Sequence, residues 1–286
     1  MGDFLQNTEK GINFLTIPSF SHTGLVTHGF STRTGGVSQD NYSSLNLGTH
    51  VGDDLAAVVE NRRRICKLLA MEPDRLVAAK QVHGHRIHQV SSSDIGLGAL
   101  DYQSALDNID ALITDVPGVP ISTYYADCVP LLFLDPVKKV IALAHAGWKG
   151  TVSLIGRKTV LEMVKTYGCD PRQILIGIGP SIGPNCYQVG EGVAIKVQEV
   201  FPYWQELLKP SGDEAWKLNL WEANRKQLVE MGIKRENISM ANLCTCCHNK
   251  IFYSYRADGG ITGRLGAMLM LKTEGGGKYG QNIGCR

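Results

Sequence analysis

Apolar side chains recur every three to four residues in several stretches of the chain, and this spacing predicts amphipathic helices. In one stretch, Val152, Ile155 and Val160 would share a face. Another stretch follows Asp53 and Asp54, whose acidic side chains favour the N-terminus of a helix. The predicted helices span residues 51–71, 151–167, 189–200 and 221–231.

Short apolar or β-branched runs bounded by Pro, Gly or Asp predict strands between these helices. Because the strands occur in pairs as often as they alternate with helices, we expect an α+β fold, with mixed β-sheets packed with helices in one layered domain. This domain would cover residues 24–272, between an N-terminal segment (1–23) and a flexible Gly-rich tail (273–286). The predicted strands are residues 76–79, 86–90, 111–114, 121–124, 131–134, 140–144, 174–178 and 251–255.

The composition is that of an ordinary globular protein, with 43% hydrophobic and 20% charged residues. The net charge of 29 − 27 = +2 offers no attraction for nucleic acid or an anionic membrane. The longest apolar runs, such as residues 129–134, are far shorter than the roughly 20 residues of a membrane-spanning helix. The N-terminus lacks the apolar segment of a secretory signal. We therefore expect a cytoplasmic monomer or homodimer that binds neither nucleic acid nor membrane.

The eight cysteines are expected to be reduced in that compartment. Four neighbouring donors, Cys244, Cys246, Cys247 and His248, suggest a metal site at first sight. They follow one another too closely for the usual chelate, and no second such pair occurs elsewhere. We therefore predict that this group packs near a substrate pocket, beside residues 253–260.

Three other segments carry donors at the ends of predicted strands: His83, Cys128 and His145. Two imidazoles and one thiolate would give Zn²⁺ or Cu²⁺ three ligands and leave a position open, as in catalytic sites. Hydrogen-bonded histidines and a packed thiol are the alternative, because the spacing is not that of a local motif. His85 is a further candidate, since it would share a strand face with His83, whereas His88 would point away.

The remaining histidines, His22, His28 and His50, have no partner pattern, and we expect structural or surface roles for them. Arg33 lies in a Gly-flanked polar turn and is suited to clamp an oxyanion. The amides after Gly147 would lie at a helix N-terminus, where an anion is favoured.

Seven motifs together resemble the laccase-domain family of the YfiH/YlmD type, also known as polyphenol oxidases or multifunctional purine nucleoside phosphorylases. They occur in family order over residues 24–271. The resemblance implies a YfiH-like fold and a metal site formed by His83, Cys128 and His145, and it leaves His85 without a ligand role. The motifs are STRTGGVS, LNLGTHVGDD, QVHG, YADCVPLLFLDP, AHAGWKGT, GIGPSIGPNCYQVG and SYRADGGITGR.

The activity that this family implies is a zinc-dependent one, with Cu²⁺ as the other candidate metal. Adenosine, inosine, guanosine and S-methyl-5′-thioadenosine would be cleaved by phosphate to the base and a pentose 1-phosphate. Adenosine would also be deaminated to inosine, which requires a water activated for attack on the purine. The substrates would thus be purine nucleosides and phosphate.

Further site residues are predicted around this metal. Arg33, Lys149, Arg256 and Arg264 are the candidates for binding phosphate, and Arg33 and Asp127 are the catalytic candidates. If the backbone is extended at Asp127, its side chain points away from that of Cys128 and orients a histidine or the substrate. A turn-forming Asp that accepts backbone hydrogen bonds is the alternative.

Other functional classes remain open from the sequence. A cysteine hydrolase would use Cys128 as nucleophile and His145 as base, which requires a thiolate free of metal. A copper-dependent polyphenol oxidase needs several His-rich sites, and eight histidines support it poorly. A non-catalytic module would bind purines without turnover.

Overall fold

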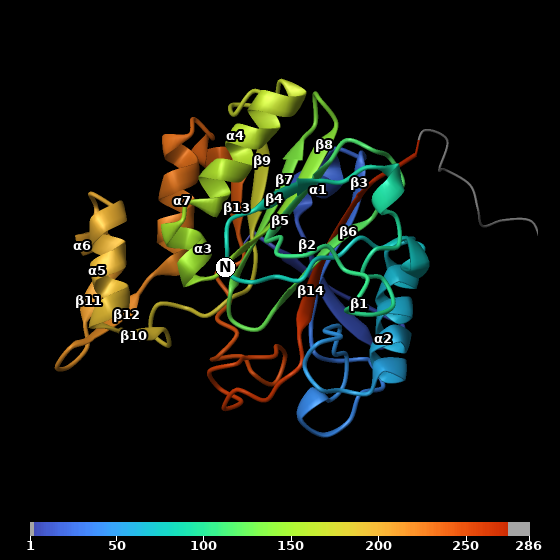
Figure 1. The fold of residues 1–286 in the computed structure, drawn as a ribbon, viewed down its shortest axis with the longest axis horizontal. Helices are drawn as coiled ribbons and strands as arrows, with labels where there is room; N and C mark the ends of the chain where they lie inside the picture. Colours follow the sequence, from blue (N-terminus) through green and yellow to red (C-terminus); the bar gives the residue numbers. More distant parts are fainter. Residues whose placement is uncertain (1–2, 274–286) are drawn as a thin grey trace, which may run out of the picture.

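Two β-sheets stacked face to face form the centre of the structure, and helices cover both outer faces (Figure 1). The computed structural model describes residues 3–273. Helix α2 (Leu55–Leu68) covers the outer face of a five-stranded sheet, and a group of helices covers the outer face of a six-stranded sheet. This arrangement confirms the predicted α+β class, in which mixed sheets pack with helices.

The five-stranded sheet is antiparallel throughout, in the order β1-β2-β3-β14-β6. Only β6 was among the predicted strands. Strands β1 and β2 lie within residues 1–23, the segment that the sequence prediction separates from the domain. The strands are β1 (Leu5–Glu9), β2 (Ile12–Thr16), β3 (Val26–Ser31), β14 (Leu265–Leu271) and β6 (Ile121–Tyr125).

The six-stranded sheet is mixed, in the order β13-β9-β7-β8-β5-β4, with parallel pairing only at its two ends. A separate three-stranded sheet has the order β10-β12-β11. The strands of the larger sheet are β13 (Ile238–Met240), β9 (Leu175–Ile178), β7 (Val129–Asp135), β8 (Val140–Ala146), β5 (Ala111–Thr114) and β4 (Ile87–Gln89). Those of the smaller sheet are β10 (Gln188–Gly190), β12 (Ala215–Leu218) and β11 (Leu208–Pro210).

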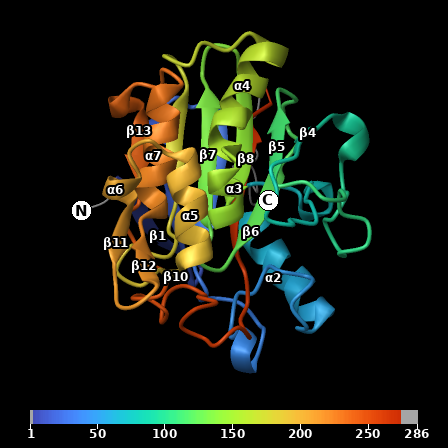
Figure 2. The ribbon, with the colours of Figure 1, turned by 60° about the vertical axis from the view of Figure 1, so that its left-hand side comes forward.

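Helices α3, α4 and α7 lie over the outer face of the six-stranded sheet, and α5 packs against α3 and the three-stranded sheet (Figure 2). Their bounds are α3 (Trp148–Val152), α4 (Ile155–Tyr167), α5 (Glu191–Val200) and α7 (Leu220–Glu230). Two further short helices are α1 (Pro18–His22) and α6 (Trp204–Leu207), and single 3₁₀ turns lie at Asp40–Tyr42, Pro73–Arg75, Ser92–Asp94 and Arg235–Asn237.

The predicted helices are present, but one of them is broken. The helix predicted over residues 151–167 is divided by Leu154, whose backbone is left-handed at φ 59°, and α4 begins only after it. Helix α2 begins later than predicted because the side chain of Asp54 accepts a hydrogen bond from the Ala56 amide and caps it.

Two predicted strands are wrong. Residues 76–79 form only isolated bridges, at Val77 and Ala79. Residues 251–255 form turns, in which the amides of Ile251 and Phe252 donate to the carbonyl of His248. Phe252 is buried like a strand residue, so its apolar character reflects burial and not extended backbone.

Strands β7 and β8 are buried on both faces, and their alternating side chains serve two cores. Leu132 and Leu143 pack between the two sheets, whereas Leu131 and Ala144 pack under the helices. His145 follows Ala144, so its side chain lies on the face that looks toward the five-stranded sheet.

Within residues 3–273, no helix is long and apolar enough to cross a lipid bilayer. The flexible tail predicted for residues 273–286 lies outside the described residues, apart from Thr273.

Arg62 is a buried cation on α2 that ties two loops together. Its guanidinium donates to the carbonyls of Leu47, Gly98 and Ala99 at 2.9, 2.6 and 2.6 Å. It also lies 4.5 Å from the ring centroid of Tyr124. A residue that satisfies three buried carbonyls is costly to remove, since each is left without a donor.

We expect Arg62→Met to lower the free energy of unfolding by about 3 kcal/mol, because the buried carbonyls lose their charged donor. The neighbouring Arg63 is exposed and pairs with Glu60, so Arg63→Met should cost less than about 1 kcal/mol. Chemical denaturation of both variants measures the difference. Equal losses would show that α2 depends on its surface charges and not on the buried guanidinium.

Candidate metal centre and its pocket

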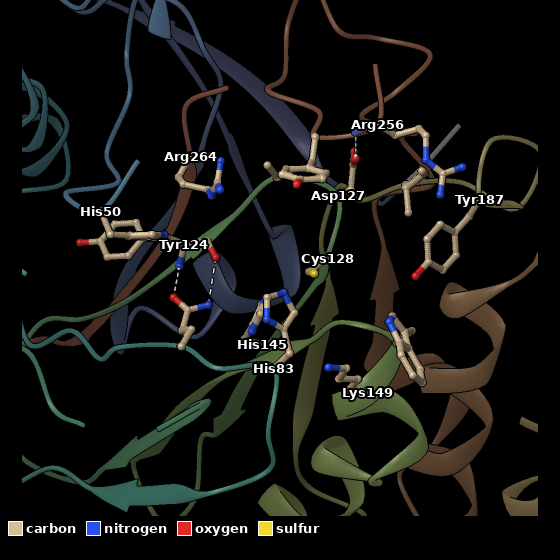
Figure 3. A pocket seen from close by; sticks show the side chains of 15 residues that line it. His50, His83, Tyr124, Asp127, Cys128, His145, Lys149, Tyr187, Arg256 and Arg264 are labelled. Carbon is tan, nitrogen blue, oxygen red and sulfur yellow. Dashed lines mark hydrogen bonds between the residues drawn. The ribbon is translucent and has the colours of Figure 1, made fainter. Parts of the chain in front are cut away.

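His83, Cys128 and His145 converge at one point of the structure (Figure 3). One ligand atom from each lies within 4.8 Å of those of the other two. The imidazoles of His83 and His145 meet edge to face, with ring centroids 4.8 Å apart. The three side chains range from exposed (His83) to buried (His145), so the centre lies at the edge of the protein interior.

Strand pairing brings two of these residues together. Val129 pairs with Ala146 and Pro130 with His145 across the antiparallel strands β7 and β8. Cys128 directly precedes β7, so it lies beside the end of β8, on the same face as His145. His83 comes from the loop before β4 and has a left-handed backbone at φ 60°. The expectation that His83 and His85 share a strand face is therefore wrong.

A buried carboxylate that the sequence did not reveal holds His83 and His145 in place. Oδ1 of Asp110 lies 2.9 Å from Nδ1 of His145 and accepts the amide of His83 at 3.0 Å. Oδ2 accepts the amides of Gly84 and Val82 at 2.7 and 3.3 Å. Burial would raise the pKa of Asp110, but the bonds from His145 and the amides hold it below its usual value. The contact leaves Nε2 of His145 to face the centre.

Cys128 and His145 form a mutually stabilised ion pair in the metal-free chain. Burial acts to raise the pKa of the Cys128 thiol, but the charge and hydrogen bonds of His145 and His83 lower it to about 6. Burial likewise acts to lower the pKa of His145, and Cys128 and Asp110 raise it to about 9. At neutral pH the pair is thus a thiolate and an imidazolium.

Gly147 leaves the room that the three donors need. A Cβ at this position would lie 2.8 Å from Sγ of Cys128 and 3.0 Å from Cδ2 of His83, which is too close for either contact. The packing of the donors therefore requires a residue without a side chain at this position. The donor set of two imidazoles and one thiolate fits Zn²⁺ with one position left open.

A cavity of about 520 Å³ opens above these donors. Trp148, Tyr187 and Tyr255 contribute aromatic surface to its walls. Its cationic lining residues are Lys149, Arg256 and Arg264, all three of which were predicted to bind phosphate. A cavity with apolar planes and a few charged groups is typical of small-molecule sites.

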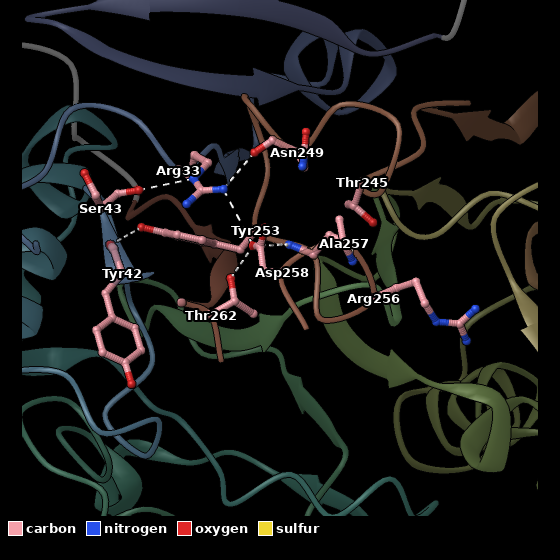
Figure 4. A network of polar contacts seen from close by, with 12 residues as sticks. Arg33, Tyr42, Ser43, Thr245, Asn249, Tyr253, Arg256, Ala257, Asp258 and Thr262 are labelled. Carbon is pink, nitrogen blue, oxygen red and sulfur yellow. Dashed lines mark hydrogen bonds and ion pairs between the residues drawn. The ribbon is translucent and has the colours of Figure 1, made fainter. Parts of the chain in front are cut away.

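Arg33 does not line this cavity, so the structure corrects its predicted place beside the metal. It lies instead in a network of polar contacts (Figure 4). Its guanidinium donates to the carbonyls of Ser43 and Asn249 at 3.1 and 2.7 Å. It also lies 3.6 Å from the Asp258 carboxylate and 4.6 Å from the ring centroid of Tyr253. These contacts of the Arg33 guanidinium hold two loops together, which explains why the residue lies in a Gly-flanked turn.

Asp127 lines the cavity, but its backbone is not extended, because its φ is 86°. Its Oδ1 accepts the Thr245 hydroxyl at 2.6 Å, and its Oδ2 accepts the Arg256 amide at 2.7 Å. These contacts correspond to the turn-forming alternative. Asp110, and not Asp127, orients the ring of His145.

The other histidines take different places. His85 is exposed and outside the group of three donors, and His28 is buried, where its Nε2 accepts the amide of Ile17 at 2.7 Å. His50 lines the cavity, where burial and then Arg264 and Arg62 lower its pKa to about 4. His50 is exposed, as expected for a surface role, but no motif marked it as a residue of the cavity wall.

The stacked sheets and their three-donor centre define an α+β protein with a candidate catalytic metal site. Residues 27–272 match the family model described as multi-copper polyphenol oxidoreductase laccase, and the chain belongs to this family. The resemblance seen in the motifs is thereby confirmed.

Curated relatives support this membership. Purine nucleoside phosphorylase YlmD of Geobacillus stearothermophilus is 38% identical over 96% of this chain and 99% of its own. A crystal structure of YlmD from that organism has a TM-score of 0.90 at 37% identity, over 96% of this chain and 100% of that one. YlmD of Bacillus subtilis, with the same name, is 41% identical over 86% and 89% of the two chains. Adenosine deaminase RL5, from an unknown prokaryotic organism, is 33% identical over 82% and 90%.

The ion pair predicts how metal affinity depends on pH. Between pH 6 and 9 the metal-free pair holds one proton, on His145. Zn²⁺ binds a thiolate and a neutral imidazole, so binding releases this proton. Because of this release, the affinity for Zn²⁺ should rise about tenfold for each unit of pH in that range. The gain should end above pH 9, where His145 is already neutral. Competition against a chromophoric chelator measures the profile, and a flat line between these limits would contradict the ion pair.

Loss of the orienting carboxylate should weaken the centre. We expect Asp110→Asn to lower zinc affinity about 10–100-fold, because the amide cannot accept both the imidazole and the loop amides. Asp127→Asn is the matched control, since its carboxylate is bonded to Thr245 and Arg256 and to no ligand imidazole. Zinc titration of both variants compares them, and equal losses would mean that any change in the pocket disturbs the metal.

Proposed function

We propose that this chain is a zinc-dependent enzyme that acts on purine nucleosides in the cytoplasm, as a monomer or homodimer. It would cleave adenosine, inosine, guanosine and S-methyl-5′-thioadenosine with phosphate and deaminate adenosine to inosine. The observation that carries the proposal is the three-donor centre at the base of a cavity with aromatic and cationic walls. The names of the relatives, purine nucleoside phosphorylase and adenosine deaminase, support the substrate class.

His83, Cys128 and His145 would hold the metal. When bound, Zn²⁺ supplies a Lewis acid that polarises an oxygen at its open position. The chain's own contribution is to fix the ligands: Asp110 sets the direction of the His145 ring and holds the His83 loop.

The aromatic walls suit a purine base, whose flat faces stack on rings. Tyr187 and Trp148 both line the cavity, and the Arg256 guanidinium lies 5.5 Å from the centroid of the Tyr187 ring, which fixes that wall. Asp127 also lines the cavity, and each of its carboxylate oxygens keeps a lone pair for a hydroxyl of the ribose.

Phosphate would be met by the cationic residues of the cavity. Lys149 is exposed at the start of α3, and its Nζ lies 5.8 Å from the centroid of the Trp148 ring. Its long side chain can therefore change conformation to contact a bound anion. Arg264 is mostly buried and donates to the carbonyls of Thr262 and Gly263, so it acts as a fixed positive charge. Phosphorolysis needs this charge because the attacking group and the developing product are anionic.

A second candidate function rests on one specific contact chain. Asp110, His145 and Cys128 lie in the order of a carboxylate, a base and a thiolate, which is the arrangement of a cysteine nucleophile. Such an enzyme would work without metal. The two functions therefore make opposite predictions about chelation.

The deciding experiment assays purified protein with inosine plus phosphate and with adenosine, before and after metal removal. We expect chelation to lower both activities at least about 100-fold, since the three ligands form a catalytic site, and added Zn²⁺ to restore them. Cys128→Ala should lose both the metal and the activity, whereas Cys169→Ala, which alters a buried thiol outside the centre, should keep them.

Activity that survives chelation in full but is lost in Cys128→Ala would favour the cysteine nucleophile. Binding of nucleoside without turnover in the zinc-loaded protein would favour a non-catalytic module.

A further inference from the structure

Three thiols meet at a second point of the structure, away from the centre described above. Sγ atoms of Cys186, Cys244 and Cys247 all lie within 4.8 Å of one another, and those of Cys186 and Cys247 are 3.3 Å apart. We refer to these three residues as the thiol cluster. We propose that the thiol cluster binds a second Zn²⁺ ion, with a structural role.

The sequence predicts that Cys244 and Cys247 pack near a pocket without a metal, and the proposal adds Cys186 as a third donor. The expectation that these donors follow one another too closely is wrong for one pair, because Cys244 and Cys247 are separated by two residues, the usual spacing of zinc-binding cysteines. The missing partner is Cys186, which is distant in the sequence and reaches the pair only through the fold. No local pattern reveals such a ligand.

The distances fit a zinc ion. Four sulfurs at the usual Zn–S length of about 2.3 Å in a tetrahedron lie about 3.8 Å from one another. The sulfurs of the thiol cluster all lie within 4.8 Å of one another, and those of Cys186 and Cys247 are 3.3 Å apart, so small side-chain rotations would complete the geometry. The fourth position is left to water or to the neighbouring Cys246.

The backbone around Cys244 is arranged to support a thiolate. Its sulfur accepts the amides of Gly183 and Cys247, at 3.1 and 3.4 Å. The second of these bonds closes the turn that joins the two cysteines of the pair. Amide donors to sulfur stabilise the charged form, which is the form that binds metal. Cys247 is exposed, so an ion can reach the cluster from solvent.

The position of the cluster defines its role. It joins the segment around Cys186 to the loop that begins at Cys244, and both segments continue into the cavity wall, at Tyr187 and at Arg256. The guanidinium of Arg256 already donates to the carbonyl of Cys186, at 3.1 Å. None of the three cysteines is among the described residues that line the cavity. A zinc ion here would therefore fasten one wall of the cavity without touching a substrate.

Metal analysis of the full-length protein, purified under reducing conditions without chelator, tests the proposal independently of any activity. We expect two zinc ions per chain in the native sequence, one in Cys247→Ser and one in Cys128→Ala, because each variant removes a ligand from a different site. The double variant should hold none. Cys169→Ala is the matched control and should keep both ions, since its thiol belongs to neither group.

Cobalt substitution identifies the ligands. In the Cys128→Ala background, Co²⁺ at the thiol cluster should give the intense near-ultraviolet absorption of sulfur-to-metal charge transfer, and Cys247→Ser should abolish it. Circular dichroism of each variant confirms that it is folded.

One zinc ion per chain that is retained in Cys247→Ser would overturn the proposal. So would a native protein whose intact mass, measured without reductant, is lower by two hydrogens and whose Cys186 and Cys247 are recovered as a disulfide, since the thiols would then be consumed. If the only zinc found is lost in Cys247→Ser and kept in Cys128→Ala, the thiol cluster is the zinc site and the proposed catalytic function fails instead.

Discussion

The carboxylate of Asp110 is the single group on which the geometry of the centre depends. It is completely buried and accepts three amides of one loop together with the imidazole of His145. A charge in this position is tolerated only because hydrogen bonds replace its hydration. The same bonds give the His83 loop its shape, so the loop and the strand that carry two of the donors cannot be displaced independently.

The motifs predicted that His83, Cys128 and His145 belong to one site, and the structure brings these three side chains together. They did not reveal Asp110, because a single acid before a strand has no distinguishing pattern. Arg33 was misplaced for a related reason: a guanidinium in a Gly-flanked turn suits an anion and also suits the carbonyls that it contacts here. Sequence alone cannot choose between these partners.

The fold, like the site, was predictable from the sequence only in part. The buried strands of the six-stranded sheet carry continuous apolar runs, which are visible in the sequence. Strand β14 was missed because an apolar run with this length suits a helix or a strand equally. The break before α4 was missed because Leu154 adopts a left-handed backbone that Gly or Asn would normally signal. Long-range pairing and packing decided each of these cases.

The pairing of β7 with β8 also limits which changes of chain length the protein can tolerate. An insertion in the turn between these strands, at residues 136–139, would leave the pairs Pro130–His145 and Val129–Ala146 intact. One extra residue inside β8 would rotate every following side chain to the opposite face and direct the imidazole into the core beneath the helices. Within this hairpin, insertions and deletions therefore preserve the positions of Cys128 and His145 only when they fall in the turn between the two strands.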